Sequence, residues 1–276
     1  MKKRLVAAGL ICTLLLDACT GNVRPAPAQS PVRAVPVIDP AVKAQLAPAG
    51  VLRLAVFTGN PLIGSRNDTT GEIAGATVTL GTALAQRAGV PLQVVEYTSI
   101  GKLVDAAGAN AWDVTVLGVD AARRDRIDYA PAHLSVDLTY LVGPSAKVST
   151  IADADRTGMR IAAARGSVPA ILLSRSLQRA TFVQTETEAS AFDLLKAGRV
   201  QAIAQDRSHL TQLAPRLAGS RVLDDRLLAV ELAMALPKGR RAALRYVEEF
   251  IEQAKASGLV QRAMDAAEAG GVTPAR

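Results

Sequence analysis

Short apolar runs alternate with amphipathic stretches from Gly50 to the C-terminus. Runs rich in Val, Ile, Leu and Ala that are bounded by Gly, Pro or polar residues predict strands. They lie at 51–56, 91–95, 113–117, 138–142, 160–164, 181–184, 200–204 and 228–236. Stretches whose apolar residues recur at helical spacing predict helices. They lie at 78–89, 100–107, 188–198 and 242–269, with one more beginning near Val168.

The alternation of strands with helices predicts an α/β fold with a mainly parallel sheet. Ligands of such sheets bind beyond the carboxyl ends of the strands. Gly118 and Asp120 follow the predicted strand 113–117, and Asp206 follows the predicted strand 200–204. These strand ends are therefore where a binding site is expected.

The N-terminus has the pattern of a secretion signal. A positive start, Met1-Lys2-Lys3-Arg4, precedes the apolar run 5–16, which is shorter than the roughly 20 residues of a membrane-spanning helix. The residues Leu16-Asp17-Ala18-Cys19 resemble a bacterial lipobox, although Asp17 departs from the usual small or apolar residue. We expect a signal peptide over 1–18 and a lipid on Cys19. The alternative is plain cleavage near Ala18, which leaves Cys19 a free thiol.

Residues 19–49 are rich in Pro and Ala. Repeated Pro disfavours helices and sheets, so this segment is predicted to be an extended linker. The mature protein is then expected in the periplasm, anchored to a membrane through Cys19. Cys12 leaves with the signal, so no intramolecular disulfide is expected.

Composition limits the kinds of site that the chain can form. Aromatic residues are only 3% of the chain, which disfavours a site that stacks flat ligands on rings. The net charge of +7 is scattered, with no basic stripe and interleaved aromatics, so nucleic acid is not expected as a partner. His133 and His209 have no partner at metal-ligand spacing, and His209 is expected at the surface. No cofactor motif or nucleophile elbow is present, so neither a metal, a cofactor nor an enzyme is expected.

Seven segments occur in a recognisable order between Gly50 and Val272. They read GVLRLAV, GEIAGATVTLGTALAQRAGV, WDVTVLGVDAARRDRIDYAPAH, LTYLV, MRIAAARGS, AFDLLKAGRVQAIAQD and ALPKGRRAALRYVEEFIEQAKASGLV. Together they resemble the type II periplasmic solute-binding proteins of ABC transporters, amino-acid class, which form family 3 of the bacterial extracellular solute-binding proteins.

This resemblance implies two Rossmann-like α/β lobes joined by two hinge strands. Lobe 1 would comprise 50–139 and 234–276, and lobe 2 would comprise 140–233. The implied function is that of the periplasmic substrate-binding component of an ABC uptake transporter. A monomer would capture a small polar solute, an amino acid or a related zwitterion, by closing its lobes, and would then dock on an inner-membrane permease.

The resemblance also implies the two residues that hold the ligand. An Arg five residues before the family's Asp-Phe-Ser-like triplet, here Asp128-Tyr129-Ala130, binds the α-carboxylate, and this residue is Arg123. A guanidinium suits the task because it grips a carboxylate in two parallel hydrogen bonds. The alternative is a solvated arginine paired with Asp120 or Asp128. The neighbours Arg124 and Arg126 are expected to face water.

Asp206 matches the Asp that accepts the ligand's α-ammonium, and the alternative is a helix N-cap. Gly166 and Ser167 stand between a strand and a helix, and backbone N–H groups at a helix start favour an anion. The alternative is that Ser167 only caps the helix. Arg165 is a weaker candidate for the cleft.

Other family positions are altered, which leaves the ligand open. Gly118 and Asp120 stand where family members often have a Thr that assists the carboxylate. Family members also often have an aromatic residue that covers the ligand. No such residue is clear here, and Asn60 and Tyr97 stand near the equivalent positions. Two rival functions remain. One is a dehydratase of the cyclohexadienyl type, with Asp120 or Glu231 as its acid or base, and the other is a ligand-sensing lipoprotein without a transport role.

Overall fold

The computed structural model describes residues 38–267 and 273–274, all within one unit of the chain, residues 36–276. The predicted signal peptide, Cys19 and most of the predicted linker lie outside the described residues. Lipidation of Cys19 and an extended tether before residue 38 therefore stay predictions.

A short helix, α1 (Pro40–Leu46), occupies the end of the segment 19–49 that was expected to be an extended linker. Asp39 caps the helix through its side chain, and Pro40 fits the first helical position, where a missing N–H leaves no bond unmade. Leu46 is fully buried in the core. The expectation is wrong for these residues because a proline that starts a helix looks, in sequence, like part of a proline-rich linker.

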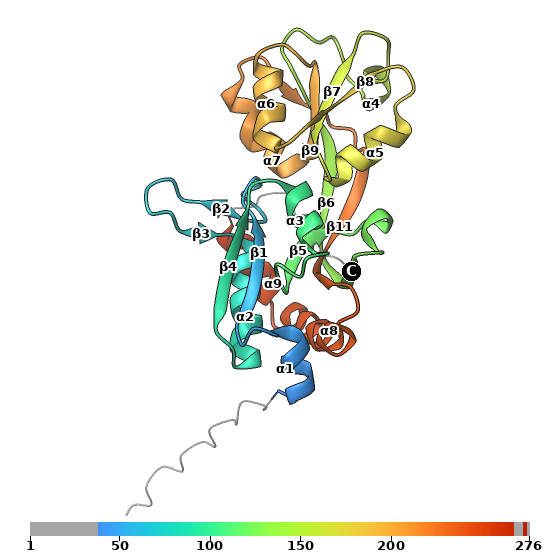
Figure 1. Ribbon diagram of the computed structural model, residues 1–276. Coiled ribbons are helices and arrows are strands. Elements are labelled where there is room, and N and C mark those ends of the chain that lie inside the picture. The colour runs from blue at the N-terminus through green and yellow to red at the C-terminus, as the bar shows by residue number, and fades with distance from the viewer. Residues whose placement is uncertain (1–37, 268–272, 275–276) are drawn as a thin grey trace, which may run out of the picture. The chain divides into compact units, whose positions relative to one another are not determined.

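The first lobe is built around two parallel strands and the helices that cover them (Figure 1). Its further elements are β1 (Leu52–Phe57), β2 (Ser65–Arg66), β3 (Ile73–Ala74), α2 (Ala76–Ala88), β4 (Leu92–Tyr97), α3 (Ile100–Ala106), β5 (Thr115–Gly118), the 3-10 turn η1 (Ala121–Arg123), α8 (Arg241–Ala256) and α9 (Leu259–Ala266). Strands β1 and β4 pair in parallel. Leu54, Leu80 and Leu84 are fully buried in one cluster, so the apolar positions that predicted β1 and α2 form the core of this lobe.

The second lobe repeats this plan with a parallel sheet of three strands. Its elements are α4 (Ile151–Ala154), β7 (Arg160–Ala164), α5 (Val168–Ser176), β8 (Thr181–Thr185), α6 (Glu188–Lys196), β9 (Ala202–Asp206), α7 (Arg207–Leu213), the 3-10 turn η2 (Ala214–Arg216) and β10 (Arg221–Val222). Strand β7 pairs in parallel with β8 and with β9. Ile161 and Ala163 belong to one core cluster and Ala162 to another, as expected when side chains alternate across a sheet with helices on both faces.

Two long antiparallel strands, β6 (Ile127–Val142) and β11 (Leu228–Pro237), run between the lobes (Figure 1). They join β5 of the first lobe to the strands of the second lobe in one sheet, with the order β5-β11-β6-β9-β7-β8, and β10 and β12 (Thr273–Pro274) pair with β6. Strands β1 and β4 form a separate two-stranded sheet, as do β2 and β3. The sheet is mixed rather than mainly parallel, because β6 and β11 are antiparallel to their neighbours β9 and β5. The fold class of two α/β lobes is confirmed, while the lobe boundaries assigned from sequence stay predictions.

The C-terminal helical stretch is divided at Gly258. A single helix was expected over 242–269, but Gly258 has a φ of +71° and separates α8 from α9. This left-handed conformation is costly for residues other than glycine. The helix therefore ends where a glycine permits the turn.

Candidate functional site

Strand ends from both lobes meet at a cavity of about 70 Å³, which has room for a few water-sized groups. Its walls are largely apolar, and the chain segments that form them include Phe57, Leu62, Ile100, Val136, Val230 and Leu232. Gly118 at the end of β5 and Asp206 at the end of β9 both line it. The site thus lies where strand polarity predicted it.

Arg123 ends the turn η1 and lies in the wall of this cavity with only 3% of its surface exposed. Its Nη1 donates to the Gly118 carbonyl at 2.8 Å, and its Nη2 donates to the Gly166 carbonyl in the other lobe at 2.6 Å. Its Nε is buried with no hydrogen-bond partner. No carboxylate among the described residues pairs with Arg123, so its charge is not neutralised by a neighbouring side chain.

The other charges of this turn have separate partners. Asp120 caps η1 by accepting from the Ala122 N–H at 2.7 Å, and Asp128 pairs with Lys238 at 2.8 Å. Neither carboxylate contacts Arg123, so the alternative of a solvated, paired arginine is wrong. Arg124 and Arg126 are exposed, as expected.

Asp206 lines the cavity from the second lobe and has 7% of its surface exposed. Its Oδ1 accepts from the His209 N–H at 2.9 Å and from Ser208 Oγ at 2.6 Å, which makes it the N-cap of α7. Its Oδ2 accepts from the Asn60 side-chain amide of the first lobe. The capping role that sequence left as an alternative is therefore present, and Oδ2 faces the opposite lobe.

Gly166 and Ser167 form the turn between β7 and α5. Gly166 has a φ of +74°, and its carbonyl accepts the Arg123 hydrogen bond. Ser167 lines the cavity, and its Oγ caps α5 by accepting from the Ala170 N–H at 3.2 Å. Pro169 has no N–H, so the first turn of α5 has fewer donors for an anion than expected. Arg123 is thus the main cationic donor at the cavity.

Besides Gly166, four residues considered from sequence lie away from the cavity wall. Tyr97 is half-buried at the end of β4, and burial raises the pKa of its hydroxyl. Asp120 is half-buried at its turn, and Glu231 is exposed on β11. Arg165 pairs with Asp105 at 3.0 Å and with Glu186 at 3.3 Å rather than entering the cleft.

Three polar side chains at the site were not predicted as ligand contacts. Gln205 and Glu188 line the cavity, and His209 Nδ1 lies 3.3 Å from Glu188 Oε2. Burial raises the pKa of Glu188, while for His209 the nearby Glu188 outweighs the effect of burial and raises its pKa. His209 has only 8% of its surface exposed, so the expectation of a surface histidine is wrong. The pairing of His209 with Glu188 of α6 depends on tertiary packing, so the sequence around His209 does not reveal it.

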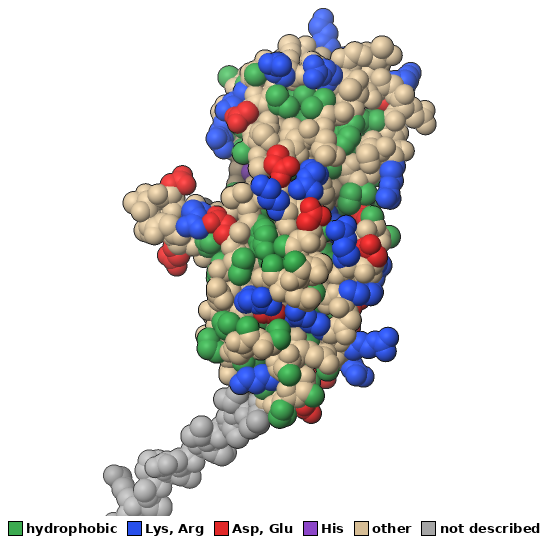
Figure 2. Space-filling view, viewed as in Figure 1, with side chains coloured by type: hydrophobic (Ala, Val, Ile, Leu, Met, Phe, Trp, Pro, Cys, Tyr) green, Lys and Arg blue, Asp and Glu red, His purple; other side chains and the backbone are tan. Residues whose placement is uncertain are grey.

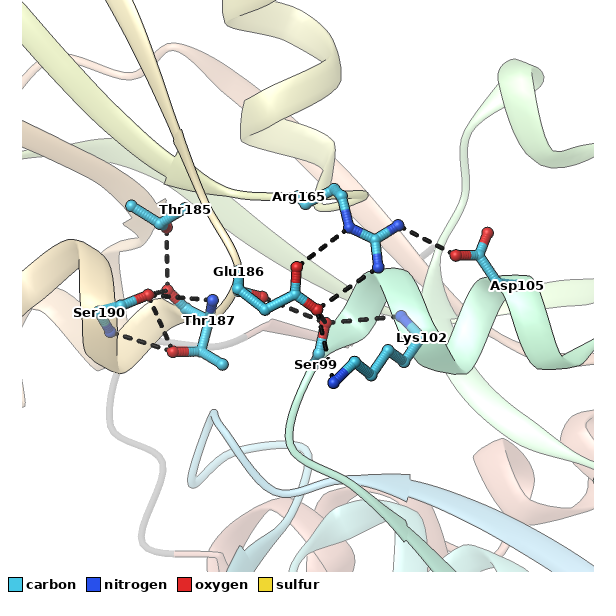
Figure 3. A network of polar contacts seen from close by, with 8 residues as sticks. All are labelled: Ser99, Lys102, Asp105, Arg165, Thr185, Glu186, Thr187 and Ser190. Atoms are coloured by element: carbon cyan, nitrogen blue, oxygen red, sulfur yellow. Dashed lines mark hydrogen bonds and ion pairs between the residues drawn. The ribbon is translucent and has the colours of Figure 1, made fainter.

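Charged side chains of both signs lie where the two lobes meet on the face shown in Figure 2. Figure 3 shows this network. Glu186 of the second lobe accepts from Arg165 and from Ser99 Oγ of the first lobe, the latter at 3.2 Å, and lies 3.8 Å from Lys102. The hydrogen bond from Arg165 stabilises the charged carboxylate of Glu186 and lowers its pKa, and Ser99 and Lys102 act in the same direction. Together with the Asn60–Asp206 bond, these contacts join the lobes in a closed arrangement.

Within residues 38–267 and 273–274, no group of three or more His, Cys, Asp and Glu side chains is arranged to hold a metal ion. None of the helices in the described part of the chain is long and apolar enough to span a membrane.

Comparison with known proteins gives one family and several relatives. The family model of the bacterial extracellular solute-binding proteins, family 3, matches residues 52–266. The glutamine-binding protein of Geobacillus stearothermophilus is 23% identical over 168 residues, which cover 59% of this chain and 64% of that protein. The match thus spans slightly less than two thirds of that relative's length.

Solved structures share the fold. The solute receptor for L-cysteine of Neisseria gonorrhoeae superposes with a TM-score of 0.74 at 21% identity, covering 84% of this chain and 95% of that one. An ancestral amino acid-binding protein, a precursor of cyclohexadienyl dehydratase, superposes with a TM-score of 0.70 at 21% identity, covering 79% and 95%. At this level of identity the likeness establishes the architecture.

Proposed function

Because the chain belongs to the family 3 bacterial extracellular solute-binding proteins, we propose that it binds a small zwitterion, an amino acid or a related compound. The observation that carries this proposal is the buried guanidinium of Arg123, which lines the cavity and has no carboxylate partner among the described residues. A buried charge is stable only when it is paired or well hydrogen-bonded. A ligand carboxylate would supply the missing opposite charge.

The two lobes offer complementary groups to the two ends of a zwitterion. Arg123 of the first lobe retains its Nε–H and further Nη hydrogens for a carboxylate. Asp206 of the second lobe, together with the neighbouring Asn60 amide, offers oxygen acceptors to an ammonium group. A ligand that meets both residues would bridge the lobes, which favours the closed arrangement over an open one.

The role in transport follows from the family and from the hinge-like strands β6 and β11. We propose that the protein acts in the periplasm as a monomer and that its closed form docks on an inner-membrane ABC permease. A lipid on Cys19 would keep it at the membrane surface. Mass-spectrometric detection of an acylated Cys19 in membrane fractions tests the anchor.

Catalysis and sensing are the two rival functions. The structural neighbour related to cyclohexadienyl dehydratase is itself an amino acid-binding precursor and shares only the fold at 21% identity. The two residues nominated for catalysis do not line the cavity: Asp120 caps a turn and Glu231 is exposed. Turnover of prephenate or arogenate would establish an enzyme, and its absence alongside ligand binding supports a binding protein. A sensing lipoprotein would bind the same ligand without stimulating transport by a reconstituted permease.

A thermal-shift screen against amino acids, opines, polyamines and small carboxylates tests the proposal. A ligand at about 100 times its Kd raises the melting temperature by roughly 5–10 °C, because it stabilises only the folded state. Arg123→Ala should abolish this shift. Arg124→Ala, an exposed neighbour in the same turn, should retain it. A full shift with Arg123→Ala would show that Arg123 does not hold the ligand.

A further inference from the structure

The second lobe presents buried polar atoms to the cavity that no protein group satisfies. Gln205 has 3% of its surface exposed and Glu188 has 9%, and both line the cavity. Neither the Nε2 nor the Oε1 of Gln205 has a hydrogen-bond partner in the described part of the chain, whereas Glu188 Oε2 and His209 Nδ1 lie 3.3 Å apart and pair with each other. Because folded proteins nearly always satisfy buried polar groups, the unpartnered carboxamide of Gln205 points to a partner from outside the chain.

The chain around Glu188 is fixed, so its inward position is set by the fold. Thr187 and Ser190 form a capping box at the start of α6, and Thr185 Oγ1 donates to the Thr187 carbonyl at 3.0 Å (Figure 3). Glu186 is held by the Arg165 network at the edge of the lobes. Two acids separated by one residue thus have different surroundings, with Glu186 half-exposed and Glu188 buried at the cavity.

We propose that Gln205, Glu188 and His209 form a side-chain subsite that selects an amino acid with an uncharged hydrogen-bonding side chain, a carboxamide or a hydroxyl. This inference rests on the proposed function, because Arg123 and Asp206 would orient the ligand's two charged groups. Gln205 and Asp206 are consecutive at the end of β9 and line the same cavity. Because both residues line this one cavity, a ligand whose ammonium meets Asp206 lies in the cavity that Gln205 also lines.

The chemistry of the subsite matches a group that both donates and accepts hydrogen bonds. The Gln205 carboxamide offers two N–H donors and an oxygen acceptor, and Glu188 offers a carboxyl oxygen. A ligand carboxamide or hydroxyl satisfies both residues at once. An aliphatic side chain of the same size would leave the Gln205 carboxamide buried and unpaired, and sites built for hydrogen bonds strongly reject such analogues.

Charged side chains fit this subsite less well. The cationic side chains of arginine and lysine are longer than those of asparagine and serine, and a closed cavity of about 70 Å³ accommodates them less well. A second carboxylate on the ligand would lie near Glu188 and Asp206, where repulsion between like charges disfavours it. The subsite therefore selects for size and polarity together.

Isothermal titration calorimetry with matched ligands tests the subsite. Asparagine, glutamine and serine are compared with leucine, which is nearly isosteric with asparagine, and with arginine and aspartate. We expect at least one of the three polar ligands to bind the wild type about tenfold or more tightly than leucine, arginine or aspartate. Gln205→Leu should abolish this preference while leucine binding is retained or improved. Gln212→Leu, an exposed position on α7, is the matched control and should keep the preference.

A second readout needs no ligand. Gln205→Leu replaces an unsatisfied buried amide with an apolar group of similar size, so the ligand-free melting temperature should not fall. Equal binding of leucine and asparagine, or tight binding of arginine, would overturn the subsite while leaving the proposed function intact if Arg123→Ala still abolishes binding. Failure of every amino acid to bind would overturn both. A fall in the ligand-free melting temperature of Gln205→Leu would show that the protein itself satisfies this amide.

Discussion

The imidazole of His133 on β6 is fully buried. Neither of its ring nitrogens has a hydrogen-bond partner within the described residues. Burial lowers its pKa to about 4, and the nearby Lys255 acts in the same direction. The unfolded chain takes up a proton near pH 6.5, whereas the folded protein resists protonation until about pH 4. This residue's contribution to stability is therefore complete above pH 6.5 and is lost as the pH falls toward 4.

We predict that His133→Leu flattens the pH dependence of stability. The wild type should lose roughly 3 kcal/mol more than the variant between pH 7 and pH 4, measured by urea unfolding at each pH. Glu188 and His209 act in the opposite direction because folding raises both of their pKa values, and they are present in both proteins. Parallel stability curves for the two proteins would contradict the assignment.

Sequence reasoning identified single residues only where a local pattern carried the information. Arg123 was selected by its spacing from Asp128-Tyr129-Ala130 and is buried at the cavity, although its contact with a ligand stays a prediction. Glu188 gave no such signal, because an acid in the first turn of a helix is ordinary and usually solvated. Its burial depends on how α6 packs beside His209, which is a property of the folded chain.

At the scale of elements, the turn between β7 and α5 controls how closely the lobes approach. Gly166 has a φ of +74°, and a Cβ at this position would lie 2.8 Å from Gly101 Cα in the first lobe. We predict that Gly166→Ala weakens ligand binding about tenfold or more, because the closed arrangement can no longer form without separating these backbones. Titration calorimetry measures the affinity.

Gly198 provides the matched control for backbone strain. Its φ of +66° is similar, but a Cβ there has no atom within 4 Å. Both alanine variants should lose about 1–2 kcal/mol of stability from the left-handed conformation, whereas only Gly166→Ala should lose affinity. Equal affinities for the two variants would mean that the contact between Gly166 and Gly101 does not limit closure.

The strands were predicted more accurately than their connections. Apolar runs fixed β1, β7 and β9 to within about two residues, since a buried strand is defined by its own side chains. The hairpin of β2 and β3 was missed because its two-residue strands are too short to form a pattern. Strand β6 begins well before the predicted run 138–142, because its first half contains Pro and charged residues.

At the scale of the whole molecule, the arrangement of two lobes around a largely apolar cavity with a few polar groups explains why the site could be predicted only in part. Each lobe contributes only one of the two charged groups at the site: Arg123 comes from the first lobe and Asp206 from the second. Their approach depends on β6, β11 and the contacts between the lobes, such as that of Asn60 with Asp206. These contacts join residues far apart in the sequence, so no local pattern reveals them.

The central claim is that Arg123 and Asp206 recognise the two charged groups of one zwitterion. The most direct test is calorimetric titration of the amino acid selected by the screen, beside its analogues lacking the α-carboxylate or the α-ammonium. The wild type should prefer the intact amino acid about 10- to 100-fold over either analogue. Arg123→Ala should bind the intact amino acid no more tightly than the wild type binds the analogue without a carboxylate. Asp206→Asn, which retains a helix cap, should bind it no more tightly than the wild type binds the analogue without an ammonium. An analogue without a carboxylate that binds the wild type as tightly as the amino acid would contradict the account.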